Sequence, residues 1–215
     1  MAKVVSYSEA ISDLDIELRS LLFEGIKKDG VTYSIIEGED KIDISSPDDT
    51  SAKLSIFLYK ISENTDLKNQ NFEIKDDEIK GNPIFLNLFY LITPNTKDNI
   101  SDHIIMGKII QIINDNPIPE NEYFQKNGLK LLLNPLSIDD LNKIWSMTAN
   151  SKPYKLSISI EITPLKIESM KTETITEVKE VELKFKSKDN VNSKTTEIDE
   201  ELKKIKDKSI DIIEL

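Results

Sequence analysis

Two stretches of the chain place apolar side chains on both faces of a predicted β-strand. They are LSIFLYKI, residues 54–61, and FLNLFYLITPN, residues 85–95, which reaches a proline near its end. A strand that is apolar on both faces belongs in the middle of a sheet, where other layers cover it above and below. We therefore expect these two stretches to form the central strands of the fold.

Four further stretches predict strands around that central pair. KIDIS, residues 41–45, and YKLSISIEI, residues 154–162, alternate apolar and polar positions. This alternation is typical of a strand with one buried face, and in KIDIS it also fits a sheet edge. VTYSII, residues 31–36, is rich in strand-forming residues, and LKLLLN, residues 129–134, is a short, mostly apolar run, so each predicts a further strand.

Three segments repeat apolar residues at helical spacing. The first begins at the capping box Ser6-x-x-Glu9 and runs to Gly25, the second spans about 101–114, and the third follows Ser137-x-x-Asp140. Their apolar faces carry Tyr7, Ile11, Leu14, Leu18 and Leu21 in the first, Ile105, Ile109 and Ile112 in the second, and Leu141, Ile144 and Trp145 in the third. The predicted fold is α+β: a central, mostly antiparallel sheet flanked by about three helices.

The distribution of glycine and proline predicts a domain boundary. All six glycines lie at or before Gly128 and all eight prolines at or before Pro164. Because compact domains use both residues in turns, we expect a mixed α/β domain over residues 1–168 and a charged C-terminal arm over 169–215.

The predicted arm consists of short elements with no obvious neighbour in the domain. Its first part alternates Val181, Leu183 and Phe185 with charged residues, a helix-like segment follows, and the last part contains Ile210 and Ile212. A lone strand and helix of this length are marginal in water. We therefore expect the arm to become ordered against another chain.

Charge and composition exclude several kinds of partner. The formal net charge is −11, which disfavours nucleic acid and anionic membrane surfaces, since both attract basic proteins. The chain contains no cysteine and no apolar run long enough for a signal peptide or a membrane span. These features predict a protein that assembles in the cytoplasm, has protein partners and does not insert into a membrane.

The sequence carries no recognisable catalytic or cofactor motif. His103 is the only histidine, and its neighbour Asp102 would point to another face of the same helix. No phosphate-binding glycine motif occurs, and no acidic cluster has the spacing of a calcium loop. We therefore expect no enzyme activity, no metal site and no cofactor, although a pair of carboxylates brought together by the fold remains an alternative.

Residues 62–83 and Trp145 are the clearest candidates for binding. The segment 62–83 is polar and rich in Asn and Asp, as a long contact loop would be. Trp145 beside Ile144 and Leu141 fits a core or interface anchor better than a ligand-binding aromatic residue. An alternative function is thus a soluble, non-catalytic module that binds a protein or small ligand through this loop and Trp145.

Four segments in order resemble the cap, or tail-terminator, proteins of contractile injection systems. They include the FLY strand followed by Asn64, Leu67 and Asn69, a strand ending YLIT, the helix with His103–Gly107 running to NDNP, and PLS leading to Trp145. The resemblance covers roughly residues 5–165. Many relatives carry Arg where this chain has Lys68, and Lys cannot reproduce a bidentate contact.

The resemblance implies a structural protein that forms a ring, usually of six copies, at the tube end farthest from the baseplate. Such a ring terminates polymerisation of the inner tube and sheath and links the two. The predicted arm would then add a strand from 174–186 or 209–215 to the next copy or to the sheath. Candidate partner-contact residues are Asn64, Leu67, Lys68, Asn69, Trp145, Val181, Leu183, Phe185, Ile210 and Ile212.

Overall fold

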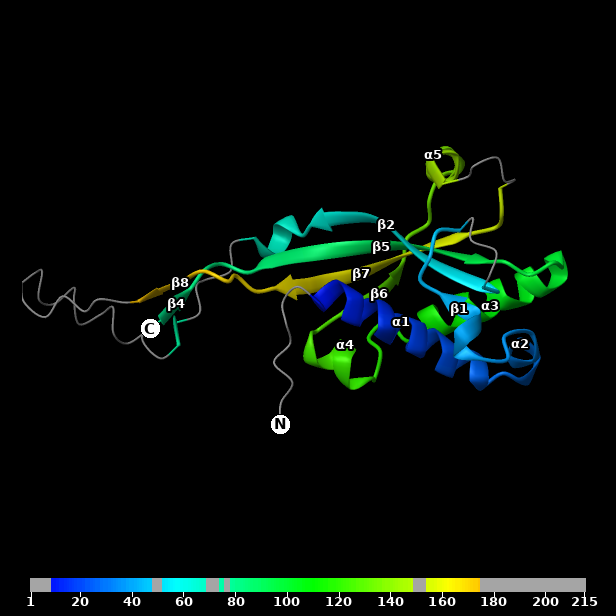
Figure 1. The fold of residues 1–215 in the computed structure, drawn as a ribbon, viewed down its shortest axis with the longest axis horizontal. Coiled ribbons are helices and arrows are strands. Elements are labelled where there is room, and N and C mark those ends of the chain that lie inside the picture. Colours follow the sequence, from blue (N-terminus) through cyan, green and yellow to red (C-terminus); the bar gives the residue numbers. More distant parts are fainter. Residues whose placement is uncertain (1–8, 48–51, 69–73, 76–77, 149–153, 175–215) are drawn as a thin grey trace, which may run out of the picture. The chain divides into compact units, whose positions relative to one another are not determined.

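The computed structural model describes residues 9–47, 52–68, 74–75, 78–148 and 154–174 (Figure 1). The chain divides into two units, Met1–Ile175 and Thr176–Leu215, and every described residue belongs to the first. The predicted division at residue 168 stays a prediction. Several predicted features lie outside the described residues, namely the capping box at Ser6, Asn69, Val181, Leu183, Phe185, Ile210 and Ile212.

A five-stranded sheet forms the centre of the first unit, in the order β1-β2-β5-β7-β6. The β1–β2 pair is parallel and the other three pairs are antiparallel, which confirms the predicted mixed, mostly antiparallel sheet. The strands are β1 (Ile42–Asp43), β2 (Leu54–Glu63), β5 (Ile84–Pro94), β6 (Lys130–Leu133) and β7 (Ile158–Ile167).

The two most hydrophobic strands differ in how far they are covered. β5 lies in the middle of the sheet and is buried from Leu88 to Pro94, as predicted. β2 is buried at Leu54–Ile56, but its second half carries the exposed residues Lys60, Ile61 and Glu63. The prediction that both strands are covered above and below is therefore wrong for the end of β2.

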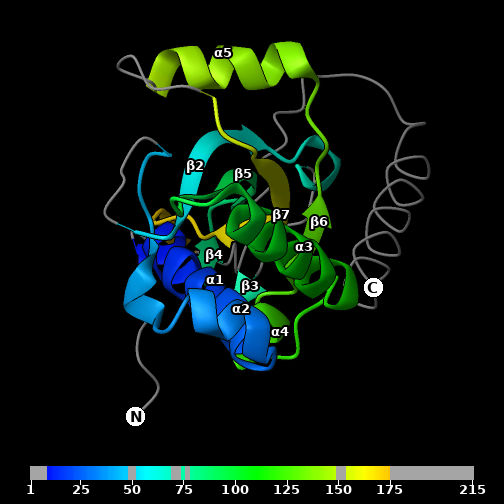
Figure 2. The ribbon, with the colours of Figure 1, turned by 90° about the vertical axis from the view of Figure 1, so that its right-hand side faces the viewer.

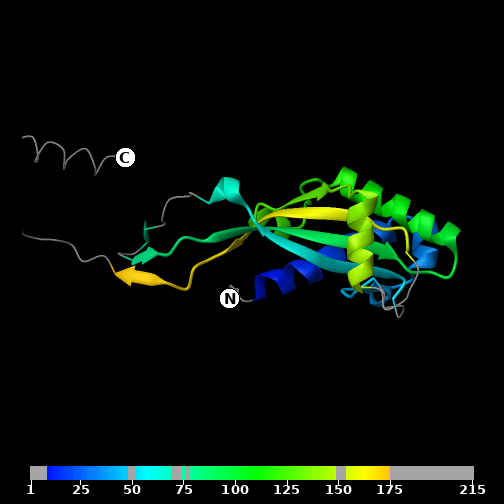
Figure 3. The same cartoon turned by 90° about the horizontal axis from the view of Figure 1, so that it is seen from above.

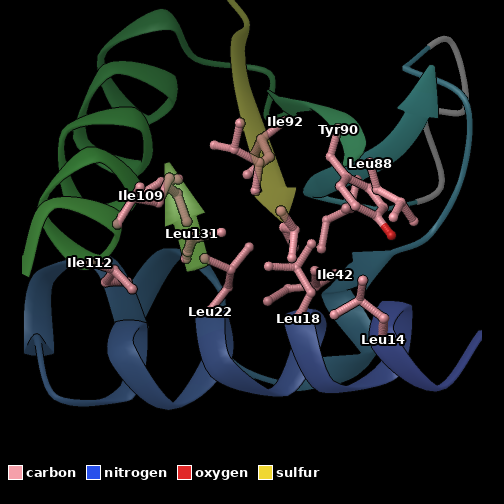
Figure 4. Close-up of a cluster of buried hydrophobic side chains, with 14 of the residues drawn as sticks. Leu14, Leu18, Leu22, Ile42, Leu88, Tyr90, Ile92, Ile109, Ile112 and Leu131 are labelled. Atoms are coloured by element: carbon pink, nitrogen blue, oxygen red, sulfur yellow. The ribbon is translucent and has the colours of Figure 1, made fainter. Parts of the chain in front are cut away.

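Helices lie on both faces of this sheet. Figure 2 shows α1 (Ala10–Lys27), α2 (Gly30–Ile35), α3 (Asn99–Asp115) and α4 (Glu122–Lys126) on one face, and α5 (Ile138–Thr148) over the other. The main core fills the space between the sheet and the first of these faces (Figure 4). Its members include Leu14, Leu18, Leu22, Leu88, Tyr90, Ile92, Ile109, Ile112 and Leu131.

The first helix continues past the glycine at which it was expected to stop. α1 ends at Lys27, and Gly25 lies inside it. A Cβ atom at Gly25 would lie 2.5 Å from Cδ1 of Ile112 on α3. The missing side chain therefore lets the two helices approach closely, and the prediction of a helix end at this glycine was wrong.

VTYSII was expected to be a strand and is a helix. Residues 30–35 form α2, because the Asp29 side chain accepts a hydrogen bond from the Thr32 backbone N–H at 3.2 Å and caps the first turn. Thr32 is fully buried. The capping bond and this burial outweigh the strand preference of the β-branched residues.

The two alternating stretches form strands with shifted limits. KIDIS contributes only β1, two residues at the sheet edge, preceded by the 3₁₀ turn Glu39–Lys41. β7 begins at Ile158 instead of residue 154, since its pairing with β5 ends at the Ile92–Ile158 pair. Residues 154–157 thus have no partner strand and leave the sheet.

The segment 62–83 is more ordered than the predicted loop. It contains the end of β2, the 3₁₀ turn η3 (Thr65–Leu67) and two short strands, β3 (Ile74–Lys75) and β4 (Glu78–Lys80). β4 pairs with β8 (Thr172–Thr174), so the backbone at the start of the predicted arm returns to this segment (Figure 3). These strands form a second sheet, in the order β3-β4-β8.

Candidate partner-contact surfaces

Asn64 ties the end of β2 to the two neighbouring strands. Its Nδ2 donates to Oδ1 of Asn87 on β5 at 2.9 Å and to Oγ1 of Thr163 on β7 at 3.3 Å. Thr163 Oγ1 in turn donates to Asn87 Oδ1 at 2.6 Å. One amide therefore spans three strands at the point where the chain leaves the sheet, which holds that exit in one place.

The same side chain shapes the turn that follows. Asn64 Oδ1 accepts a hydrogen bond from the Asp66 backbone N–H at 3.2 Å and caps η3. Lys68, just after the turn, is exposed, and its Nζ lies 3.3 Å from Oε1 of Glu63. The structure thus brings Asn64, Leu67 and Lys68 together as a small turn surface, in which Lys68 presents a single point charge.

A second set of polar side chains lies on the sheet face under α5. The Tyr59 hydroxyl is 2.9 Å from Ser159 Oγ, and the hydroxyl oxygens of Thr93 and Ser157 are also 2.9 Å apart. These bonds join β2, β5 and the start of β7, so buried polar atoms are paired across strands. Asn87, Thr163 and Tyr59 were not predicted from the sequence, in which the polar residue in FLNLF was the available signal.

Helix α5 carries Trp145 and begins at the predicted capping box. Ser137 Oγ accepts from the Asp140 backbone N–H at 3.2 Å and donates to Asp140 Oδ2 at 2.7 Å. Trp145 is 5% exposed, and its ring meets the ring of Tyr154 edge-on with centroids 5.8 Å apart. The tryptophan therefore anchors α5 from its inner side and does not face the solvent.

Helix α5 exposes one large apolar side chain at each end, whereas Asp139, Asn142, Lys143 and Ser146 are exposed polar residues between them. Ile138 and Met147, at its two ends, are 77% and 78% exposed. Beside Ile138, a depression of about 190 Å³ is lined by Ile138, Leu141, Asn142 and Tyr154. Because an exposed apolar side chain beside an apolar depression gains from being covered, the Ile138 end of α5 is a candidate contact for another protein.

His103 lines another depression without forming a catalytic pair. This open depression, about 270 Å³, is also lined by Asp102, Lys97 and Lys155. Asp102 accepts hydrogen bonds from the Thr96 backbone N–H at 2.9 Å and from Thr96 Oγ1 at 2.6 Å. Its carboxylate is thus engaged in holding the turn before α3, and His103 is an exposed residue beside it.

The half-buried carboxyl group of Asp15 has a raised pKa, but its hydrogen-bond partner is a tyrosine. Burial raises the pKa of Asp15, and the hydrogen bond that Tyr90 donates at 2.7 Å partly offsets this. The same burial raises the pKa of the Tyr90 hydroxyl. Asp15 lines neither depression. The described residues contain no cluster of three or more His, Cys, Asp or Glu placed to hold a metal ion.

None of the helices in the described part of the chain is long and apolar enough to cross a membrane.

Comparison with known proteins identifies relatives for this fold. The family model described as the Pvc16 N-terminal domain matches residues 14–180. The sheath/tube terminator of an extracellular contractile injection system, PVC, in its extended state has a similar structure, with a TM-score of 0.58 and 17% identity, covering 89% of this chain and 69% of that chain.

A second similar structure is the tube-terminating cap of the anti-feeding prophage. It gives a TM-score of 0.49 and 20% identity over 66% of this chain, and this chain covers 53% of that cap's length. No curated protein sequence matches the chain.

Proposed function

We propose that this chain, which belongs to the Pvc16 N-terminal domain family, is a structural cap protein of a contractile injection system. It forms a ring on the tube end farthest from the baseplate, terminates polymerisation of the inner tube and the sheath, and links the two. The family match over residues 14–180 is the observation that carries this proposal, and the shared fold with a sheath/tube terminator supports it.

The structure supplies what a ring subunit needs. Its central strand is buried and its exit turn at Asn64 is held by hydrogen bonds to two strands, so the outer surfaces keep fixed positions. Two candidate contacts, the η3 turn and helix α5, lie at separate parts of the fold (Figure 3). A head-to-tail contact closes into a ring when the rotation between neighbouring copies divides a full turn evenly, and we propose six copies.

The test is to produce particles with and without this chain and to measure their lengths by electron microscopy. We expect particles that lack the chain to have variable lengths and uncapped ends, and the chain labelled in complete particles to lie at one end. Particles of normal, defined length without the chain would overturn the proposal.

Two exposed lysines give a matched pair of variants for the same assay. Lys68→Glu reverses the charge on the turn surface and should reduce the amount of chain that co-sediments with particles, because it places like charges together at a contact that the lysine complements. Lys126→Glu, in the last turn of α4, makes the same change elsewhere and should bind as the parent does. Saturable binding to a protein unrelated to injection systems would instead favour a general binding module.

A further inference from the structure

The outer edge of β2 has no partner strand over its second half. β1 pairs only with Leu54 and Ser55, and β2 continues to Glu63. In the described part of the chain, no strand pairs with the outer side of β2 beyond those two residues. Residues 58–63 are therefore an open sheet edge, here called the β2 edge.

The register shows which backbone groups face outward at this edge. The Asn95 N–H donates to the Lys53 carbonyl, and the Asn64 N–H donates to the Phe85 carbonyl. Because hydrogen-bonded and non-hydrogen-bonded pairs alternate in antiparallel ladders, and the ladder shifts between Leu58 and Lys60, Leu58, Ile61 and Glu63 direct their N–H and C=O groups away from β5.

The side chains of the same residues lie on the face that carries the main core. Leu58 packs against that core, whereas Ile61, opposite Leu88, is 47% exposed. An apolar edge with unpaired backbone groups is a template for another strand, and natural proteins cover or block such edges. Lys60, whose ammonium lies 4.6 Å from the Phe89 ring centroid, is the one charge within the β2 edge before Glu63.

The sequence beyond the last described strand contains a matching segment. Residues 180–186, EVELKFK, place Val181, Leu183 and Phe185 on one side and charges of both signs on the other. Paired with the β2 edge, the apolar side would cover Ile61, and Glu182 could meet Lys60. The match is thus one of length, alternation and charge.

Strand directions favour a neighbouring copy as the source of this segment. β2 and β7 are both antiparallel to β5, so they run the same way. Figure 3 shows β8 running in that direction too, beyond the end of β2 at Glu63. The described chain therefore ends at Thr174 beyond the β2 edge, and its last strand points away from that edge.

We propose that residues 180–186 of one copy add a strand to the β2 edge of a second copy, with Leu183 on the side of Leu58 and Ile61. This strand addition rests on the proposed ring, which supplies the second copy. It assigns the intersubunit contact to a defined edge and gives the exposed half of β2 the partner strand that its hydrophobicity requires.

Cysteine crosslinking of full-length chains tests the proposal directly, since the natural chain contains no cysteine. Chains carrying Ile61→Cys are mixed with chains carrying Leu183→Cys, assembled with the tube and sheath proteins, and oxidised. We expect a disulfide-linked dimer on a non-reducing gel. The pair Ile61→Cys with Lys184→Cys, on the opposite side of the added strand, should give much less dimer.

Two controls keep the outcome decisive. Ile16→Cys, a half-exposed residue on α1, mixed with Leu183→Cys measures chance collision and should give no dimer above background. If Ile61→Cys unfolds, Glu63→Cys on the same face repeats the test against Val181→Cys, its partner in an antiparallel addition, and Phe185→Cys, its partner in a parallel one. A chain that carries both Ile61→Cys and Leu183→Cys should link to other chains and not to itself.

The contrary results are equally specific. Equal crosslinking at positions 183 and 184, no crosslinking, or links only within one chain would each overturn the addition of a strand to a second copy. Defined particle ends without crosslinks would remove this inference and leave the cap function standing. Crosslinks between chains that have no effect on particle length would support the strand addition and overturn the cap function.

Discussion

β5 and β2 have almost the same hydrophobic character but different surroundings. β5 has a strand on each side, and its residues from Leu88 to Pro94 are buried. Among the described residues, β2 has a partner strand on only one side beyond Ser55, and Ile61 is 47% exposed. The comparison teaches that the apolar side chains of a strand are expected to be covered, and that the covering layer can belong to another chain.

The largest expected effect compares two residues that face each other across these strands. Leu88 and Ile61 are register partners. Leu88→Ala should lower the free energy of unfolding by about 2–5 kcal/mol, because it leaves a cavity in the core. Ile61→Ala should cost roughly 0.5 kcal/mol, as at other exposed positions. Urea unfolding of both purified variants measures the difference, and equal losses would mean that the β2 edge is covered within one chain.

A pair of glycines extends the comparison to the helices. Gly25→Ala brings a methyl group against Ile112 and should lower the free energy of unfolding by about 1–3 kcal/mol through overpacking. Gly107→Ala, on α3 with nothing within 4 Å of the added atom, should raise it by about 0.5–1 kcal/mol. Thermal unfolding gives both signs. Ile112→Val should restore part of the stability lost in Gly25→Ala.

A smaller effect is expected at the junction of β2 and β5. Asn64→Ala removes the bonds to Asn87 and Thr163 and the cap of η3, and should cost about 1 kcal/mol. Asn142→Ala on α5 is the control, an exposed asparagine whose loss should change stability by less than about 0.5 kcal/mol. Chemical unfolding measures the free energy of unfolding of both variants. Equal values would mean that the hydrogen bonds from Asn64 to Asn87 and Thr163 contribute nothing.

The smallest effect is a pH dependence of stability that comes from Asp15, whose carboxylate accepts a hydrogen bond from Tyr90 on β5. Burial raises the pKa of Asp15, so the folded state binds the proton more tightly than the unfolded state does. The free energy of unfolding therefore falls as pH rises from about 3.9, the ordinary value, through the folded-state pKa. Asp15→Asn keeps an oxygen acceptor for the Tyr90 hydroxyl and removes this loss.

The measurement is the unfolding free energy of Asp15→Asn and the parent at pH 7 and pH 3. We expect the variant to be slightly more stable at pH 7, with the gap closing at pH 3. A parent that is the more stable of the two at pH 7 would mean that the charged hydrogen bond from Tyr90 outweighs the cost of burying Asp15.

Much of the element order could be predicted from residue patterns alone. The second helix, the third helix with its cap at Ser137, and β6 appear where periodicity placed them. α2 and the continuation of α1 through Gly25 could not be predicted. Both depend on packing between residues that are far apart in the sequence. Thr32 is buried by other parts of the fold, and Ile112 on α3 lies close to Gly25 on α1.

The candidate contact surfaces were only partly visible in the sequence. Asn64, Leu67 and Lys68 were expected at a contact and lie together in one turn, although whether they bind a partner stays a prediction. Trp145 lies on the inner side of α5, and the exposed large apolar side chains of this helix are instead Ile138 and Met147 at its two ends. Which side of a short amphipathic helix faces the sheet depends on packing that one sequence does not show.

By itself, the sequence determined the α+β class, the two most hydrophobic strands and the shortage of catalytic groups, because local periodicity and composition follow directly from residue order. Only the tertiary structure decided that β5 is central while half of β2 is an open edge. Strand order and register join residues far apart in the chain, so the exposure of Ile61 depends on which strands lie beside it and not on its own neighbours in sequence.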